Sequence, residues 1–159
     1  NLSQITGINT GTLKTIRRLS MQISARNQIS GTVELIEHGK INAEIFIKLK
    51  SGYTLVSVIT NTAANNLNLE IGDEVVAIFK SSTVLITTDI TLNISARNKF
   101  QGTVDSINQD EINTELVIDI GNNDKIASVI TSSSFERLKI EKGTQVSAII
   151  KASDVIIGK

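Results

Sequence analysis

The sequence has no cysteine, proline or tryptophan, and its aromatic residues are one tyrosine and four phenylalanines. Without cysteine there are no disulfides, thiolate nucleophiles or cysteine metal sites. So few aromatic rings leave little surface for stacking bases, and a formal net charge of zero lacks the basic excess typical of nucleic-acid binding. No apolar run approaches the ~18 residues that a membrane helix needs, and no signal peptide is visible. We therefore expect a cytoplasmic protein that neither spans a membrane nor itself binds nucleic acid.

A sequence repeat at an offset of 71 residues is the dominant feature of the chain (95 − 24 = 71 for the matching serines). The segment Ile23–Asn27 (Ile-Ser-Ala-Arg-Asn) returns unchanged as Ile94–Asn98, and the copies align without a gap. A repeat of about 70 residues indicates two copies of one small domain and not a solenoid. The sequence therefore predicts a leader or connector helix over residues 1–20, a first domain over 21–88 and a second over 89–159.

Apolar residues alternate with polar ones over residues 41–49 and again over 112–120, which is the period of half-buried strands. Further strands are expected at 21–24, 31–36, 55–59, 75–79, 84–86, 126–130, 146–150 and 155–157. A short helix is predicted over 62–67, and its counterpart begins with a capping box from Ser133 to Glu136. The predicted fold is all-β: two tandem small OB-like barrels, each with one short helix, preceded by a short N-terminal helix. The linker 87–93 is short and not glycine-rich, so the barrels should pack together.

No catalytic constellation is apparent. His38 lies at a turn signal, and Gln109 occupies its position in the second copy, so we interpret it as a solvated histidine. Glu44 and Glu115 are repeated on the polar phase of a strand, which favours a solvent-facing or inter-repeat ion pair over acid–base chemistry. The repeated serines of Ser-Ala-Arg have no repeated base to activate them. The sequence predicts a protein that is not an enzyme, with no cofactor and no metal ligands.

The duplication preserves hydrogen-bond donors at strand ends and turns. Thr60 and Thr131 stand where a strand meets a short helix, whose first N–H groups lack partners. Hydroxyls, such N–H groups and a lysine suit a small, fully deprotonated oxyanion, because a protonated one would need an acceptor. The alternative is that these hydroxyls only cap turns and helices. The repeated donors are Ser24, Arg26, Thr60, Lys80 and Ser82, matched by Ser95, Arg97, Thr131, Lys151 and Ser153.

Several of these segments, among them Ser24–Asn27, Asn42–Glu44, Phe79–Ser82 and Lys151–Ile157, resemble the Mop domain of molbindins. The resemblance covers 21–86 and 93–158. It implies that molybdate or tungstate binds between subunits or repeats, held by backbone N–H groups and by serine, threonine and lysine side chains without direct coordination of the metal. The residues carried over are Ser24, Ala25, Arg26, Thr60, Lys80 and Ser81 in the first copy and Ser95, Ala96, Arg97, Thr131, Ser134, Lys151 and Ala152 in the second.

The resemblance implies that Lys80 with Ser81 arrives from another subunit or repeat. The chain departs from the pattern at Ala63, where related regulators have a serine that Ser134 retains in the second copy. The first site is therefore expected to lack one donor, or to replace it with water or Thr62.

Two branches of that family fit the sequence. Residues 13–20 resemble the helix leading into the sensing half of molybdate-responsive transcription regulators, which are homodimers, and a start at Asn1 is expected of a fragment or processed chain. An N-terminal DNA-binding domain would then precede this chain in the full protein. The intact Ser-Ala-Arg-Asn of the second copy favours the alternative, a free cytoplasmic molbindin that stores or buffers molybdate as a homotrimer. A third class, an OB-type nucleic-acid module, is disfavoured by charge and aromatic content.

Overall fold

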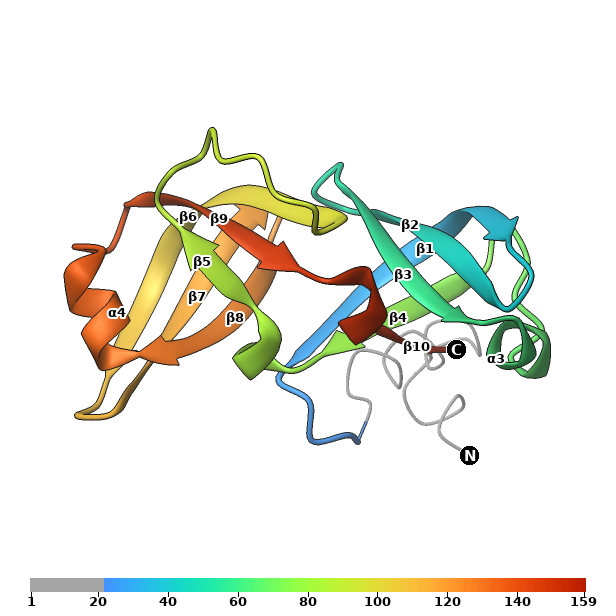
Figure 1. Cartoon of the computed structure of the whole chain (residues 1–159), viewed down its shortest axis with the longest axis horizontal. Coiled ribbons are helices and arrows are strands. Elements are labelled where there is room, and N and C mark those ends of the chain that lie inside the picture. Colours follow the sequence, from blue (N-terminus) through green and yellow to red (C-terminus); the bar gives the residue numbers. More distant parts are fainter. Residues whose placement is uncertain (1–21) are drawn as a thin grey trace, which may run out of the picture.

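The computed structural model describes residues 22–159, which form two small β-sheet units (Figure 1). Each unit is built on a five-stranded antiparallel sheet and has one short helix. The strand orders are β10-β4-β1-β2-β3 and β5-β9-β6-β7-β8. The predicted all-β class, with two small units that each have one helix, is confirmed. The helix predicted over residues 1–20 lies outside the described residues.

The second repeat follows the first, element by element, with ends that shift by one residue at most from the sequence offset. The first repeat comprises β1 (Asn27–His38), β2 (Asn42–Leu49), β3 (Thr54–Thr60), α3 (Asn61–Asn66), β4 (Glu74–Phe79), the 3-10 turn η1 (Ser81–Thr83) and β5 (Leu85–Thr87). The second comprises β6 (Asn98–Gln109), β7 (Asn113–Gly121), β8 (Asp124–Thr131), α4 (Ser132–Arg137), β9 (Gln145–Ile150), η2 (Ala152–Asp154) and β10 (Ile156–Gly158).

The alternation in β2 and β7 behaves as predicted within the strands. Ala43, Ile45 and Ile47 are fully buried, and the residues between them are half-exposed. The prediction was wrong at its first position, because Ile41 and its counterpart Ile112 are 74% and 75% exposed. Both precede the strand and belong to the turn, where their carbonyl groups accept the first N–H of α3 and α4.

The strand predicted over residues 21–24 is also wrong for its described part, 22–24, which forms no strand. The reason lies in the register of β1. Its first residue, Asn27, pairs with Phe79, the last residue of β4, so the sheet offers no partner before it. The Ser-Ala-Arg segment is thereby left as an exposed lead-in to β1.

Each sheet takes its fifth strand from the other repeat. β10 pairs with β4, with Ile157 opposite Ala77, and β5 pairs with β9, with Ile86 opposite Ala148. Figure 1 shows the two short strands crossing between the units. The sequence repeats and the spatial units therefore differ by one exchanged strand.

Buried hydrogen bonds hold the exchanged arrangement together in duplicate. The Asn27 side chain donates to the carbonyl of Ala127 and accepts its N–H, both at 2.8 Å, and Asn98 does the same with Val56. Ser57 Oγ donates to the Val155 carbonyl at 2.7 Å, next to the start of β10. Asn27 and Asn98 are almost fully buried, so each side-chain amide pairs with the backbone of the other repeat out of contact with water. The buried apolar side chains of both repeats form one hydrophobic cluster.

Candidate functional site

The repeated Ser-Ala-Arg segments lie beside the lysine of their own repeat. Asn27 pairs with Phe79, so Arg26 and Lys80 follow on adjacent chains at the strand ends. This differs from the expectation that Lys80 comes from another subunit or repeat. Both walls of each candidate site are therefore supplied locally, by the lead-in to the first strand and by the turn after the fourth.

A cavity of ≈ 590 Å³ forms at this place in the second repeat. It brings together five of the predicted site residues, Ser95, Ala96, Arg97, Lys151 and Ala152. Three further lining residues, Val58, Thr83 and Leu85, come from the first repeat. Sequence reasoning missed these three, because their position depends on the strand exchange. The remaining lining residues are Ile94, Ile149, Ser153 and Asp154.

Each arginine of the Ser-Ala-Arg segments reaches across to the other repeat. Arg26 Nη2 lies 2.8 Å from Glu115 Oε1, and Arg97 Nη1 lies 2.7 Å from Glu44 Oε1. Glu44 and Glu115 thus each form an ion pair with the other repeat, as predicted. A guanidinium carries five N–H donors, so one carboxylate contact leaves donors for an anion. Arg97 also lies over the ring of Phe46, 6.0 Å from its centroid.

The lysines of the two sites are exposed, like the arginines, but among the described residues they are not paired with a carboxylate. Within residues 22–159, neither Lys80 nor Lys151 has an ion-pair partner for its ammonium group. Each precedes a 3-10 turn as its N-terminal cap residue. An unpaired ammonium beside a guanidinium and a serine hydroxyl forms a donor-rich surface that suits an anion, with Asp154 as the one carboxylate in the cavity lining.

Thr60 and Thr131 are the N-caps of the two helices. Thr60 Oγ1 accepts the N–H of Ala63 at 3.0 Å, and Thr131 Oγ1 accepts the N–H of Ser134 at 3.1 Å. The capping box predicted to begin at Ser133 is therefore wrong, because α4 starts two residues earlier than that motif requires. Both helices have six residues, and this N–H is already used. The helix ends are therefore not free donors; the Thr60 hydroxyl keeps its hydrogen, whereas the Thr131 hydroxyl donates to Ser134 Oγ.

Thr60 is exposed and is not among the residues lining the cavity around Ser95. It lies two residues beyond Val58 on the same face of β3, about 7 Å further along the strand. The corresponding side chain Thr131 donates to Ser134 Oγ at 2.9 Å, and Ala63 has no such hydroxyl. Thr60 therefore lies near the cavity but outside its lining, and Thr131 holds the equivalent position at the end of β8.

Other chemistry receives no support from the described residues. His38 ends β1, exposed, with Nδ1 3.0 Å from the Asn61 side-chain oxygen. Among residues 22–159 there is no group of three or more histidine, aspartate or glutamate residues that could hold a metal ion. In the same range, no helix is long and apolar enough to cross a membrane.

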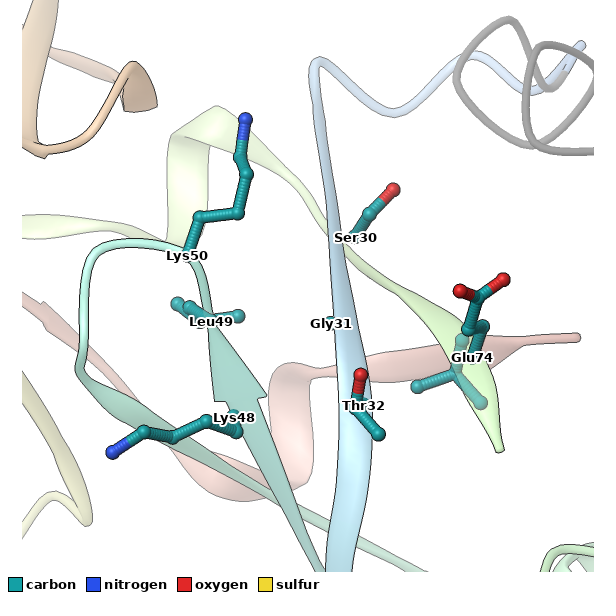
Figure 2. Close-up of a pocket in the computed structure, with 8 residues that line it drawn as sticks. Ser30, Gly31, Thr32, Lys48, Leu49, Lys50 and Glu74 are labelled. Carbon is teal, nitrogen blue, oxygen red and sulfur yellow. The ribbon is translucent and has the colours of Figure 1, made fainter. Parts of the chain in front are cut away.

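A second hollow, of ≈ 330 Å³, lies on the outer side of β1, β2 and β4 (Figure 2). Lys48 and Lys50 extend away from the strand carrying Ser30 and Thr32, and Glu74 lies on the opposite side. Lys48 Nζ donates to the Gly52 carbonyl at 2.9 Å. This hollow contains no predicted site residue, and its charged side chains point apart, so they form no convergent donor set.

The family comparison matches two segments of the chain, residues 23–86 and 94–157, to the TOBE domain. The chain belongs to the TOBE-domain family. It carries two of these domains in tandem, which confirms the resemblance to tandem Mop domains and the prediction of a binding protein rather than an enzyme.

The chain is similar to the molybdenum transport protein ModE of Azotobacter vinelandii, 35% identical over 98% of this chain and 58% of the relative. It is 36% identical to the molybdenum-pterin-binding protein MopA of Rhodobacter capsulatus, over 91% of this chain and 55% of the relative. It thus spans little more than half the length of these relatives. Among solved structures it resembles the cytoplasmic molybdate-binding protein ModG with molybdate bound, with a TM-score of 0.83 and 40% identity, covering 87% of this chain and 99% of that one.

Proposed function

We propose that this chain binds molybdate or tungstate through its two Ser-Ala-Arg sites. The observation that carries the proposal is the cavity in which Ser95, Arg97 and Lys151 converge. A guanidinium, an ammonium and a hydroxyl supply hydrogen bonds and two positive charges to a tetrahedral dianion. The similarity to a molybdate-bound ModG structure supports the same ligand class.

The same surface explains how the protein would reject phosphate. At neutral pH every phosphate ion carries one or two hydrogens, and each hydrogen needs an acceptor. A donor-rich site leaves it unpaired, and an unpaired buried polar group is costly. Molybdate has no hydrogen to place at this pH. Sulfate shares this property, so its smaller size is the basis on which it would bind less well.

Isothermal titration of the folded chain with molybdate, sulfate and phosphate tests the proposal. Molybdate should give saturable heat, sulfate a weaker response and phosphate none. Lys151→Ala should weaken molybdate binding at least about tenfold, since a charge-assisted hydrogen bond to the anion is lost. The exposed Lys142→Ala is the matched control and should bind as the unchanged chain does. A folded protein that gives no heat with molybdate would contradict the proposal.

For the cellular role, we propose the molybdate-sensing half of a molybdate-responsive transcription regulator acting as a cytoplasmic homodimer. The alignment with the ModE relative supports this role, because it extends over 98% of the chain and so includes residues ahead of the first domain. A storage molbindin is the second candidate, favoured by the match to 99% of the ModG chain. The mass of the assembly in solution separates them: a dimer supports the sensor and a trimer supports storage.

A further inference from the structure

The two candidate sites do not carry the same hydroxyl groups. Position 81 is serine in the first repeat, but its counterpart at 152 is alanine. In the first turn of the helices the difference is reversed, with Ala63 in the first repeat and Ser134 in the second. If each site used residues of one repeat only, each would have one of these two serines. The structure distributes the two serines differently, because each Ser-Ala-Arg segment faces the other repeat.

Each Ser-Ala-Arg wall faces the other repeat. Arg97 pairs with Glu44, and Glu44 lies opposite Val58 in the β2–β3 register. Val58 itself lines the cavity around Ser95. The strand that faces the second wall is therefore β3, which leads through Thr60 to Ala63.

The first wall faces the second repeat in the same way. Arg26 pairs with Glu115, which lies opposite Val129 in the β7–β8 register. β8 then leads through Thr131 to Ser134. The Ser24 wall therefore faces the strand and helix that carry the serine, and the Ser95 wall faces those that carry alanine.

We infer that the two oxyanion sites are unequal by two hydroxyl groups, and that Ser81 and Ser134 make the Ser24 site the tighter one. This inference rests on the proposed function and states which of its two sites binds the anion more tightly. Ser81 follows Lys80 in the wall beside Arg26, and Ser134 belongs to α4, the helix that directly follows the strand β8 facing that wall. The Ser95 site has alanine at both corresponding positions, 152 and 63.

The hydroxyls of the tighter site are available to an anion. Ser134 Oγ accepts from Thr131 Oγ1 at 2.9 Å and so keeps its own hydrogen free to donate. Ser81 is half-buried at the start of its 3-10 turn, and among the described residues its hydroxyl has no hydrogen-bond partner. A hydrogen bond to a charged ligand contributes at least about tenfold in affinity. Two such bonds place the dissociation constants of the two sites roughly a hundredfold apart.

Titration with molybdate, followed by calorimetry, tests the inequality. The unchanged chain should show two binding events in equal amounts, separated by roughly a hundredfold. Ser81→Ala and Ser134→Ala should each weaken the tighter event about tenfold and leave the weaker one unchanged. Ala152→Ser and Ala63→Ser should each strengthen the weaker event. The exposed strand residue Ser106 provides the control, and Ser106→Ala should alter neither event.

The variants also identify which residues share a site. If Ser81→Ala and Ala63→Ser act on the same event, the sites form within repeats and the inference is overturned. Two events of equal affinity in the unchanged chain overturn it as well. No molybdate binding at all would instead remove the proposed function. Because the alanine-to-serine variants gain affinity, folding defects cannot imitate the expected result.

Discussion

The two repeats are nearly the same fold, and the contacts between them fall into two groups. The first group occurs twice: a buried asparagine bridging to the other repeat, an arginine–glutamate pair, and a serine hydrogen-bonded beside the exchanged strand. The contacts of the second group occur once: those around Tyr53 and its counterpart Asp124, the placement of Arg97 over Phe46, and the Lys159–Asp73 ion pair. The duplicated contacts support the exchanged architecture, whereas the single ones depend on residues that differ between the repeats.

The difference at Tyr53 and Asp124 shows how one position takes two roles. Tyr53 packs on Phe100 and donates its hydroxyl to the Gln101 carbonyl at 2.9 Å. Asp124 is buried and accepts the N–H of Ser51 at 3.0 Å. Equivalent positions in a pseudo-symmetric pair thus meet different surroundings once neighbouring residues diverge.

The largest expected effect comes from the duplicated asparagines. Asn27→Ala removes two hydrogen bonds and leaves the N–H and carbonyl of Ala127 buried without partners, which costs about 3 kcal/mol of unfolding free energy. Asn98→Ala should cost the same. Urea unfolding measures both, and the exposed Asn108→Ala should stay within about 0.5 kcal/mol of the unchanged chain. A clear difference between the two asparagine variants would break the equivalence of the repeats.

The single contacts should contribute less. Asp124→Ala leaves the Ser51 N–H without its acceptor and should destabilise by about 1–2 kcal/mol. Tyr53→Phe loses one exposed hydrogen bond and should cost about 0.5–1 kcal/mol. Both are measured in the same urea experiment. Equal costs for the two variants would show that the hairpins contribute alike despite their different chemistry.

The arginine–glutamate pairs are exposed and should matter little to stability. Arg26→Gln is expected to cost about 0.2–1 kcal/mol, fading at high salt. Arg97→Gln should cost slightly more, because Arg97 also lies over Phe46, whose counterpart is Val117. Phe46→Val should remove that excess. If Arg26 proved the more important of the two, the ring contact would not explain the difference.

The smallest expected effect is a pH dependence found in one repeat. Asp105 accepts a hydrogen bond from Lys125 at 2.8 Å, which lowers the pKa of Asp105 and raises the pKa of Lys125. At the matching positions the first repeat has Glu34 and Thr54.

A lowered folded-state pKa means that the carboxylate stabilises the fold above its unfolded pKa of about 3.9 and loses this as pH falls through the folded value. A raised lysine pKa stabilises below about 10.4 and is lost as pH rises through the folded value. Lys125→Thr should therefore flatten the stability profile slightly at both ends. Coincident profiles for the variant and the unchanged chain would contradict this.

The sequence predicted much of the secondary structure for physical reasons that act locally. Alternating apolar residues located β2 and β7, because half-buried strands have a period of two. The errors were at ends: Ile41 is exposed in a turn, and the capping box at Ser133 gave way to Thr131 as the cap. Strand and helix ends depend on which backbone groups find partners, which a local pattern does not reveal.

The repeated donor residues of the candidate site were predictable from the sequence, but the residues that the other repeat contributes were not. Ser95, Arg97 and Lys151 were visible as repeated donors, and the structure brings them into one cavity. Val58, Thr83 and Leu85 were not predicted, because they reach the cavity from the other repeat. No repeat or motif marks a residue whose role is to face a distant partner.

The sequence alone determined that this chain is a duplication, that each copy is built of strands, and that serine, arginine and lysine recur as donors. These properties depend on residue types and on local periodicity. The tertiary structure decided which copy supplies which part: β5 and β10 change sheets, and the arginines reach across. Because equivalent strands present nearly identical edges, the sequence pattern permits pairing within a repeat or between repeats. Burial of Asn27 and Asn98 against the opposite repeat stabilises the exchanged arrangement.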